Sequence, residues 1–144
     1  MFMPDVNVLI YAHRGDEQYH EQYRRWLEDL VNGQQPFALS ALVAVAFVRI
    51  VTHRKFSKSP TPLSQALAVI DALVGHPNCR LLGPGPKHWQ LVADLCRRGQ
   101  HDAAAVADAQ HAAVAIENGC TWVSRDSDFY AFSACGLHWQ HLDF

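Results

Sequence analysis

The stretch DVNVLI, residues 5–10, alternates polar and apolar side chains close to the start of the chain. Because successive side chains of a β-strand point to opposite faces, the alternation predicts a strand that carries Asp5, Asn7 and Leu9 on one face. The three intervening apolar residues would then fill the other face. We therefore expect the side chains of Asp5 and Asn7 to point the same way, and take both as candidate functional residues.

Carboxylates recur in two further segments that lie far from the first in the sequence. Asp108 lies in VADAQHAA, residues 106–113, while Asp126 and Asp128 lie in SRDSDF, residues 124–129. Each acid alone also fits an ordinary turn or helix cap. Acids that a fold brings together repel one another unless cations neutralise them, and magnesium and manganese prefer oxygen ligands. Taken together, the segments predict a magnesium- or manganese-dependent phosphodiesterase site.

Strand-like and helix-like segments alternate along the rest of the chain. Ser40 and Thr61 are suited to cap helices, and glycines follow several of the periodic runs. The alternation favours an α/β fold with a mainly parallel sheet and helices on both faces, with ligands beyond the carboxyl ends of the strands. The predicted helices cover about residues 17–32, 40–52, 61–75, 87–98 and 101–119; the predicted later strands cover 37–39, a buried 79–82, 120–123 and a weaker 137–142.

The composition indicates one domain over residues 1–144. The 144 residues are 49% hydrophobic, which suits a single compact core. The net charge of -2 excludes a uniformly basic surface, so any contact with nucleic acid has to come from a local patch. The strongest cationic run consists of Arg49, His53, Arg54, Lys55 and Lys58, which also fits a solvated helix end.

The cysteines and the apolar runs indicate the cellular compartment in which the protein resides. The four cysteines are widely spaced, lack a CxxC pair and have apolar neighbours, so we expect small buried thiols in a reducing cytoplasm. No run approaches the roughly 18 apolar residues of a membrane span, and the amino-terminal run is interrupted by Asp5 and Asn7. We expect a soluble, cytoplasmic protein.

The order of these motifs resembles that of the PIN-domain ribonucleases, especially VapC-type toxins of toxin–antitoxin systems. The resemblance covers nearly the whole chain and rests on DVNVLI, on FVRIVTH at residues 47–53, on Asp108 with Ala112 and Ala113, and on SRDSDF. It implies a three-layer α/β/α PIN-like domain. It also implies an endoribonuclease that depends on Mg²⁺ or Mn²⁺, a cognate antitoxin as partner and, as is common among such toxins, a homodimer.

The resemblance also implies roles for individual residues. Asp5, Asp108 and Asp126 become the candidate metal ligands and catalytic acids, and Asp128 becomes a further catalytic acid. Supporting groups would be Asn7 and Ser124, and Arg49 would contact a substrate phosphate. We hypothesise that the metal positions water in line with the scissile RNA phosphate and stabilises the developing charge.

One position departs from the family pattern. Related toxins usually carry a glutamate near the start of the second-block helix, and alignment back from Phe47 places the equivalent position at Ala41. A methyl group cannot bind a cation. The chain is then a natural variant of low activity, a chain in which another acid compensates, or one in which a glutamate was replaced.

Two other functional classes stay open on the sequence alone. An aspartate-nucleophile phosphatase also places an acid after its first strand, but Asn7 stands where its second acid would act. A non-catalytic module that binds RNA or protein fits Ala41 and the merely local basic patch. A serine or cysteine hydrolase is disfavoured because the chain has no Gly-x-Ser-x-Gly elbow.

Overall fold

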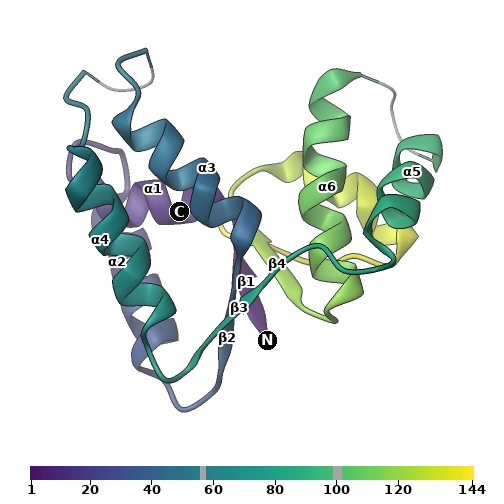
Figure 1. The fold of residues 1–144 in the computed structure, drawn as a ribbon, viewed down its shortest axis with the longest axis horizontal. Coiled ribbons are helices and arrows are strands. Elements are labelled where there is room, and N and C mark those ends of the chain that lie inside the picture. The colour runs from purple at the N-terminus through teal and green to yellow at the C-terminus, as the bar shows by residue number, and fades with distance from the viewer. Residues whose placement is uncertain (56–57, 99–101) are drawn as a thin grey trace.

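The computed structural model describes residues 1–55, 58–98 and 102–144 of the chain. Strands and helices alternate through most of this part, as the sequence predicted (Figure 1). The elements are β1 (Phe2–Pro4), α1 (Val6–His13), α2 (His20–Asn32), β2 (Phe37–Ser40), α3 (Ala41–Thr52), α4 (Leu63–Val74), β3 (Cys79–Leu82), α5 (His88–Arg98), α6 (Ala103–Glu117), β4 (Thr121–Ser124), the 3-10 helix η1 (Ser127–Cys135) and β5 (His138–His141).

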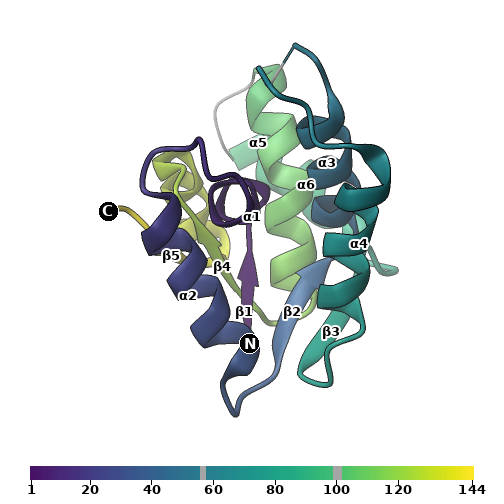
Figure 2. The same cartoon turned by 90° about the vertical axis from the view of Figure 1, so that its left-hand side faces the viewer.

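All strand pairs of the described residues are parallel, which confirms the predicted sheet type. β4 lies between β1 and β5, with Met3 paired to Trp122 and Trp122 to Trp139. β2 and β3 form a second parallel pair. β2 also packs beside β1, so that the strands follow the spatial order β3, β2, β1, β4, β5 (Figure 2). The carboxyl ends of the strands therefore meet at one edge.

Helices cover both faces of the strands, which confirms the three-layer α/β/α arrangement (Figure 1). On one side α1 packs against α2 and α3, and α3 packs against α4. On the other side α5, α6 and η1 pack against one another. Trp122 is completely buried at the centre, where its ring stacks on His111 of α6 and contacts Phe129 of η1 at a tilt of 49°.

The predicted strand at residues 5–10 is wrong, because these residues begin helix α1. The Asp5 side chain accepts a hydrogen bond from the backbone N–H of Val6 and caps the helix. Val8, Leu9 and Ala12 are buried, as expected of one helix face. Alternation over so few residues fits a strand and a short apolar helix equally well, and the actual strand is the three-residue β1 before it.

The later elements follow the sequence prediction with smaller corrections. α6 begins after Asp102, whose side chain accepts a hydrogen bond from Ala105 N–H at 2.7 Å. Ser40 occupies the N-cap position of α3 but makes no side-chain cap bond, and α4 begins after Pro62 rather than with a threonine cap. β3 has the predicted bounds but is not buried, because it has only β2 as a paired neighbour and exposes two of its four residues.

The cysteine prediction is confirmed in part. All four cysteines are free thiols, but only Cys120 is buried, while Cys79, Cys96 and Cys135 are half-buried. Among the helices of residues 1–55, 58–98 and 102–144, none has the length and apolar character needed to cross a membrane.

Candidate metal centre

Two neighbouring strands deliver acidic residues to the same edge of the sheet. Asp5 follows β1 directly, and its backbone N–H donates to Val123 O at 2.8 Å, which extends the pairing with β4. Ser124 ends β4, and Asp126 caps η1 immediately afterwards. The parallel pairing therefore brings residues from opposite ends of the chain together.

A closed hydrogen-bond network fixes the Asp5 carboxylate. Ser124 Oγ donates to Asp5 Oδ2 at 2.6 Å and accepts from the backbone N–H of Asp126 at 2.9 Å. Asn7 Nδ2 lies 3.2 Å from both Asp5 Oδ2 and Ser124 Oγ, and Asn7 Oδ1 accepts from the backbone N–H of Arg125. Asn7 and Ser124 thus position Asp5 and orient the turn that carries Asp126.

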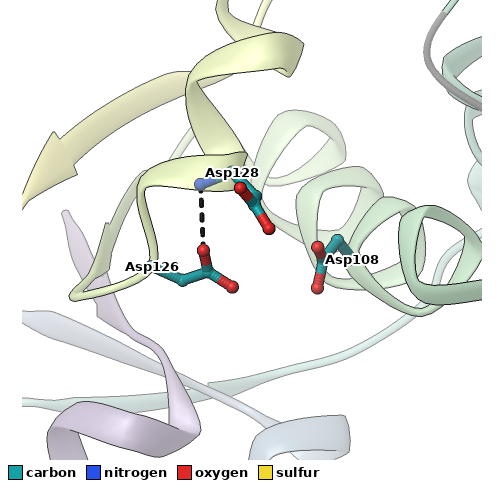
Figure 3. Close-up of side chains that lie close together, drawn as sticks. All are labelled: Asp108, Asp126 and Asp128. Carbon is teal, nitrogen blue, oxygen red and sulfur yellow. Dashed lines mark hydrogen bonds between the residues drawn. The ribbon is translucent and has the colours of Figure 1, made fainter.

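Beside this network, the carboxylates of three further residues form a compact group. Asp108 of α6, Asp126 and Asp128 each offer an oxygen atom, and these three atoms lie within 4.8 Å of one another. Figure 3 shows the three side chains turned toward a common space, with Asp126 also accepting from the backbone N–H of Asp128 at 2.9 Å. Their spacing is suitable for shared oxygen ligation of a divalent cation.

The surroundings disfavour the charged form of two of the acids. Burial raises the pKa of Asp5 to about 6, against the lowering effect of the hydrogen bonds from Ser124 and Val6. Burial, together with the charges of Asp126, Asp5, Asp128 and Asp102, raises the pKa of Asp108 to about 6. The four acids are therefore close enough to repel one another.

No ion pair of the described residues neutralises this negative charge. The salt bridges in residues 1–55, 58–98 and 102–144 involve other acids, namely Asp16, Glu21, Glu28 and Asp94. Repelling carboxylates without a basic partner favour a cation, and hard oxygen donors favour magnesium or manganese over softer metals. The donor set therefore fits the metal expected from the sequence.

The comparison with protein families settles the assignment of the fold. A model described as the PIN domain matches residues 2–134. The chain belongs to the PIN-domain family. Its PIN domain is 41% identical over 145 residues to the VapC ribonuclease Mb2897 of Mycobacterium bovis, covering 98% of this chain and 95% of that protein. It is also 36% identical over 134 residues to the ribonuclease VapC31 of Mycobacterium tuberculosis, with 93% and 94% coverage.

Solved structures show the same PIN fold at much lower sequence identity. VapBC2 from Rickettsia felis, bound to a promoter DNA fragment, matches with a TM-score of 0.68 at 18% identity and covers 99% of this chain and 98% of its own. VapC20 of Mycobacterium tuberculosis, described as a toxin that cleaves the sarcin–ricin loop, matches with a TM-score of 0.67 at 15% identity, covering 95% and 96%.

The site residues predicted from the sequence fall into two sets in this PIN domain. Asp108 and Asp126 belong to the compact group as expected, but the third member of that group is Asp128 rather than Asp5. Asp5 stands beside it, 5% exposed, within the network of Asn7 and Ser124. The metal-ligand set therefore stays a prediction that now includes Asp128.

Sequence reasoning missed the aromatic surroundings of Arg125. The central carbon of its guanidinium lies 5.0, 5.3 and 6.0 Å from the ring centroids of Tyr11, Tyr19 and Tyr23. Its backbone carbonyl accepts a hydrogen bond from His141 Nε2 at 2.8 Å. Cation–π attraction thus anchors the residue between Ser124 and Asp126. The only sequence signal was an arginine inside an otherwise acidic motif.

Arg49 and Ala41 lie on helix α3 of the PIN domain. Arg49 is exposed in the last turn of the helix, so its predicted phosphate contact stays a prediction. Ala41 is the first residue of the helix, and a Cβ atom added at Gly83 would lie 3.6 Å from its methyl group. Gly83 follows β3, which adjoins β2 on the side away from β1. Ala41 therefore borders the side of β2 opposite to Asp5.

Proposed function

We propose that this chain is a divalent-metal-dependent endoribonuclease and the toxin of a toxin–antitoxin pair. The observation that carries the proposal is the convergence of four carboxylates on one edge of the sheet, with those of Asp108, Asp126 and Asp128 within 4.8 Å of one another. The family membership and the 41% identity to a protein named as a VapC ribonuclease support RNA as the substrate.

In this proposal the acids have distinct tasks. Asp108, Asp126 and Asp128 hold Mg²⁺ or Mn²⁺, and the buried Asp5 completes the negative field beside them. When bound by these carboxylates, the metal would supply Lewis-acid polarisation of the scissile phosphate and a water molecule of lowered pKa. Ser124 and Asn7 keep Asp5 and the turn before Asp126 in place, so that the carboxylates need little rearrangement when RNA binds.

Helix α3 supplies no acid to this site, and two of its alanines are candidates for the missing position. Ala41 is the position that the family resemblance indicates, but it borders the β3 side of β2. Ala46 lies five residues further along the same helix, about 140° around its axis at 3.6 residues per turn. We therefore propose to test both positions for the glutamate that the family resemblance implies.

The experiment is cleavage of a mixed structured-RNA pool with Mg²⁺ or Mn²⁺. We expect the chain to cut RNA internally, Asp108→Asn to abolish cutting, and a glutamate at Ala46 or Ala41 to increase it. Asp71→Asn on α4 removes an exposed acid outside the site and serves as the matched control. EDTA should stop the cleavage by every active variant.

The result also decides between the proposal and its alternative. If the folded chain and both glutamate variants bind RNA but never cut it, a non-catalytic binding module replaces the nuclease. If Asp108→Asn cuts as fast as the unmodified chain, the carboxylate group is not the catalytic centre. A gain at only one of the two alanines would identify the position of the absent acid.

We also propose an antitoxin and a second copy of the chain as protein partners. An apolar cavity of about 460 Å³ between α1, α2 and α4 includes Leu9, Leu27 and Leu73 and suits an apolar antitoxin segment. Exposed apolar side chains on α3 and α4, among them Val45 and Leu63, suit self-association. Light scattering of the chain alone and with a co-expressed antitoxin would test both.

The free thiols favour the cytoplasm as the compartment.

A further inference from the structure

A cavity of about 350 Å³ opens directly beside the carboxylate group. Asp108 and Asp128 belong to both, so the cavity shares a wall with the proposed metal site. Its volume lies at the lower end of the roughly 300–1,000 Å³ typical of small-molecule pockets. The remaining lining comes from the start of α6 and from η1: Asp102, Ala104, Ala105, Ser127, Tyr130, Ala131 and Phe132.

Tyr130 gives this cavity an aromatic wall. The side chain is 71% exposed, although it lies next to a well-packed region of η1. Its ring meets the ring of Trp139 edge-on, with centroids 6.1 Å apart and planes inclined by 67°. This contact supports the tyrosine from β5 while leaving much of its surface in water. An exposed aromatic ring that is held at a pocket is a platform for stacking.

The cavity lining also includes small side chains and an acid. Ala104 and Ala105 leave room for a flat group. Asp102 uses Oδ1 for the cap of α6, and in the described part of the chain no bond engages its Oδ2. A carboxylate oxygen accepts hydrogen bonds, for example from the exocyclic amine of a nucleobase. Three acids line the cavity, so a phosphate group that has no bound cation would be repelled there.

We propose that this cavity binds one unpaired nucleobase of the RNA next to the scissile phosphate, with Tyr130 as the stacking surface and Asp102 as an acceptor for a base amine. The inference rests on the proposed nuclease function, because the phosphate of the same nucleotide would lie at the cation that Asp108 and Asp128 would hold.

The arrangement restricts the substrate class. A base inside a duplex is stacked and paired, and cannot enter a side pocket unless it is turned out of the helix. Single-stranded loops and bulges offer such bases without that cost. The cavity therefore selects RNA that is unpaired at the cleavage position, and favours cytosine, adenine or guanine over uracil, which carries no exocyclic amine.

The test uses mononucleotides, so it does not depend on RNA cleavage. Binding of cytidine 5′-monophosphate, uridine 5′-monophosphate and ribose 5-phosphate to the full chain in Mg²⁺ is followed by two-dimensional amide NMR. We expect the cytidine nucleotide to bind at least roughly fivefold more tightly than ribose 5-phosphate, because stacking one base contributes about 1–3 kcal/mol. The shifted amides should include those of Ala104 and Ala105.

Variants separate the stacking from other effects. Tyr130→Ala should bind cytidine 5′-monophosphate no more tightly than ribose 5-phosphate, whereas Tyr130→Phe should keep the tighter binding of the nucleotide. Trp89→Ala removes another exposed aromatic side chain, 77% exposed on α5 and outside the cavity lining, and should also keep it. Asp102→Asn retains a capping side chain and should reduce the preference for cytidine over uridine.

Each proposal has its own contradicting result. Equal affinity of the unmodified chain for the nucleotides and ribose 5-phosphate, or an unchanged ratio in folded Tyr130→Ala, would overturn the base pocket. A separate titration with Mn²⁺ alone tests the carboxylate group. Absence of Mn²⁺ binding would contradict the metal site of the proposed function, whatever the nucleotides do.

Discussion

At the scale of single residues, Asp5 and Asp108 carry negative charge where the folded protein disfavours it. The pKa of each is about 6, above the ordinary value of 3.8. The folded state therefore holds these protons more tightly than the unfolded chain, and protonation stabilises the fold. This contribution is present below about pH 4 and is lost as the pH rises through about 6. For the buried Asp5 it is on the order of 3 kcal/mol.

We predict that Asp108→Asn stabilises the metal-free protein at pH 7. The change removes a half-buried charge that repels Asp126 and Asp5, and should add about 1 kcal/mol after allowance for solvent screening. Below pH 4 the two proteins should unfold alike, because the acid is then protonated. Denaturant unfolding in EDTA at both pH values measures this. A variant that is less stable at pH 7 would contradict the repulsion.

Asp108→Asn should also bind a divalent cation more weakly, because the variant lacks the negative charge that attracts the cation. With Mg²⁺ added at pH 7, the unmodified chain should gain melting temperature through binding linkage, and Asp108→Asn should gain little. Stability and metal affinity would then move in opposite directions at one position, as expected of a functional site.

Ser124 contributes through hydrogen bonds on both sides of its hydroxyl. Ser124→Ala would leave the backbone N–H of Asp126 without its acceptor and remove a donor to Asp5, a loss of about 1–3 kcal/mol in unfolding free energy. The pKa of Asp5 should rise further, since the Ser124 bond lowers it. Ser133→Ala, an exposed serine of η1, is the control. Thermal unfolding and NMR titration of the Asp5 carboxyl would measure the two effects, and equal behaviour of the two variants would refute the role.

At the scale of elements, the end of α6 holds the loop between β3 and α5. The carboxylate of Glu117 accepts from the backbone N–H groups of Gly85 at 2.9 Å and Lys87 at 3.1 Å. A Cβ atom at Gly85 would lie 2.6 Å from Glu117 Oε2, so an alanine there displaces the carboxylate. We predict that Gly85→Ala lowers the unfolding free energy by about 1–2 kcal/mol.

A double-mutant cycle checks this explanation. In a Glu117→Ala background, Gly85→Ala should cost nearly nothing, because the carboxylate it displaces is already gone. Additive losses in denaturant unfolding would show that the cost comes from the backbone of the loop instead.

The turn between β4 and η1 depends on elements distant from it. Tyr11 comes from α1 and Tyr23 from α2, and both rings face the guanidinium of Arg125. We predict that Arg125→Gln destabilises the fold by about 2 kcal/mol and weakens Mg²⁺ binding, because the turn that carries Asp126 loses its anchor. Calorimetric titration of Mg²⁺ measures the second effect. Arg97→Gln, an exposed arginine of α5, should leave it unchanged.

At the scale of the whole molecule, β5 and the residues after it complete the fold. Tyr23 Oη donates to Leu142 O at 2.8 Å, and the backbone N–H of Leu142 donates to Ser124 O at 2.9 Å. We predict that removal of residues 138–144 exposes β4 and abolishes cooperative thermal unfolding, measured by circular dichroism. A sharp transition near the original temperature would contradict this.

The overall architecture could be predicted because helix caps and strand–helix alternation are local signals. Asp102 marked the start of α6, and the apolar run before Ser124 marked β4. α1 could not be identified, since a short apolar segment fits the period of a helix and that of a strand equally well. The membership of Asp128 in the compact group depends on the backbone turn into η1, and the tyrosines around Arg125 gather only through tertiary packing.

The pairing of β1 with β4 also sets the time at which the site can form during synthesis. Ser124 and Asp5 stand 119 positions apart in the chain. At a translation rate of roughly 5–20 residues per second, their codons are read about 6–24 s apart. A ribosome that stalls before the codon of Thr121 therefore leaves a nascent chain without β4 and without Asp126. Broken or unfinished messages would thus yield fragments that lack the complete carboxylate group.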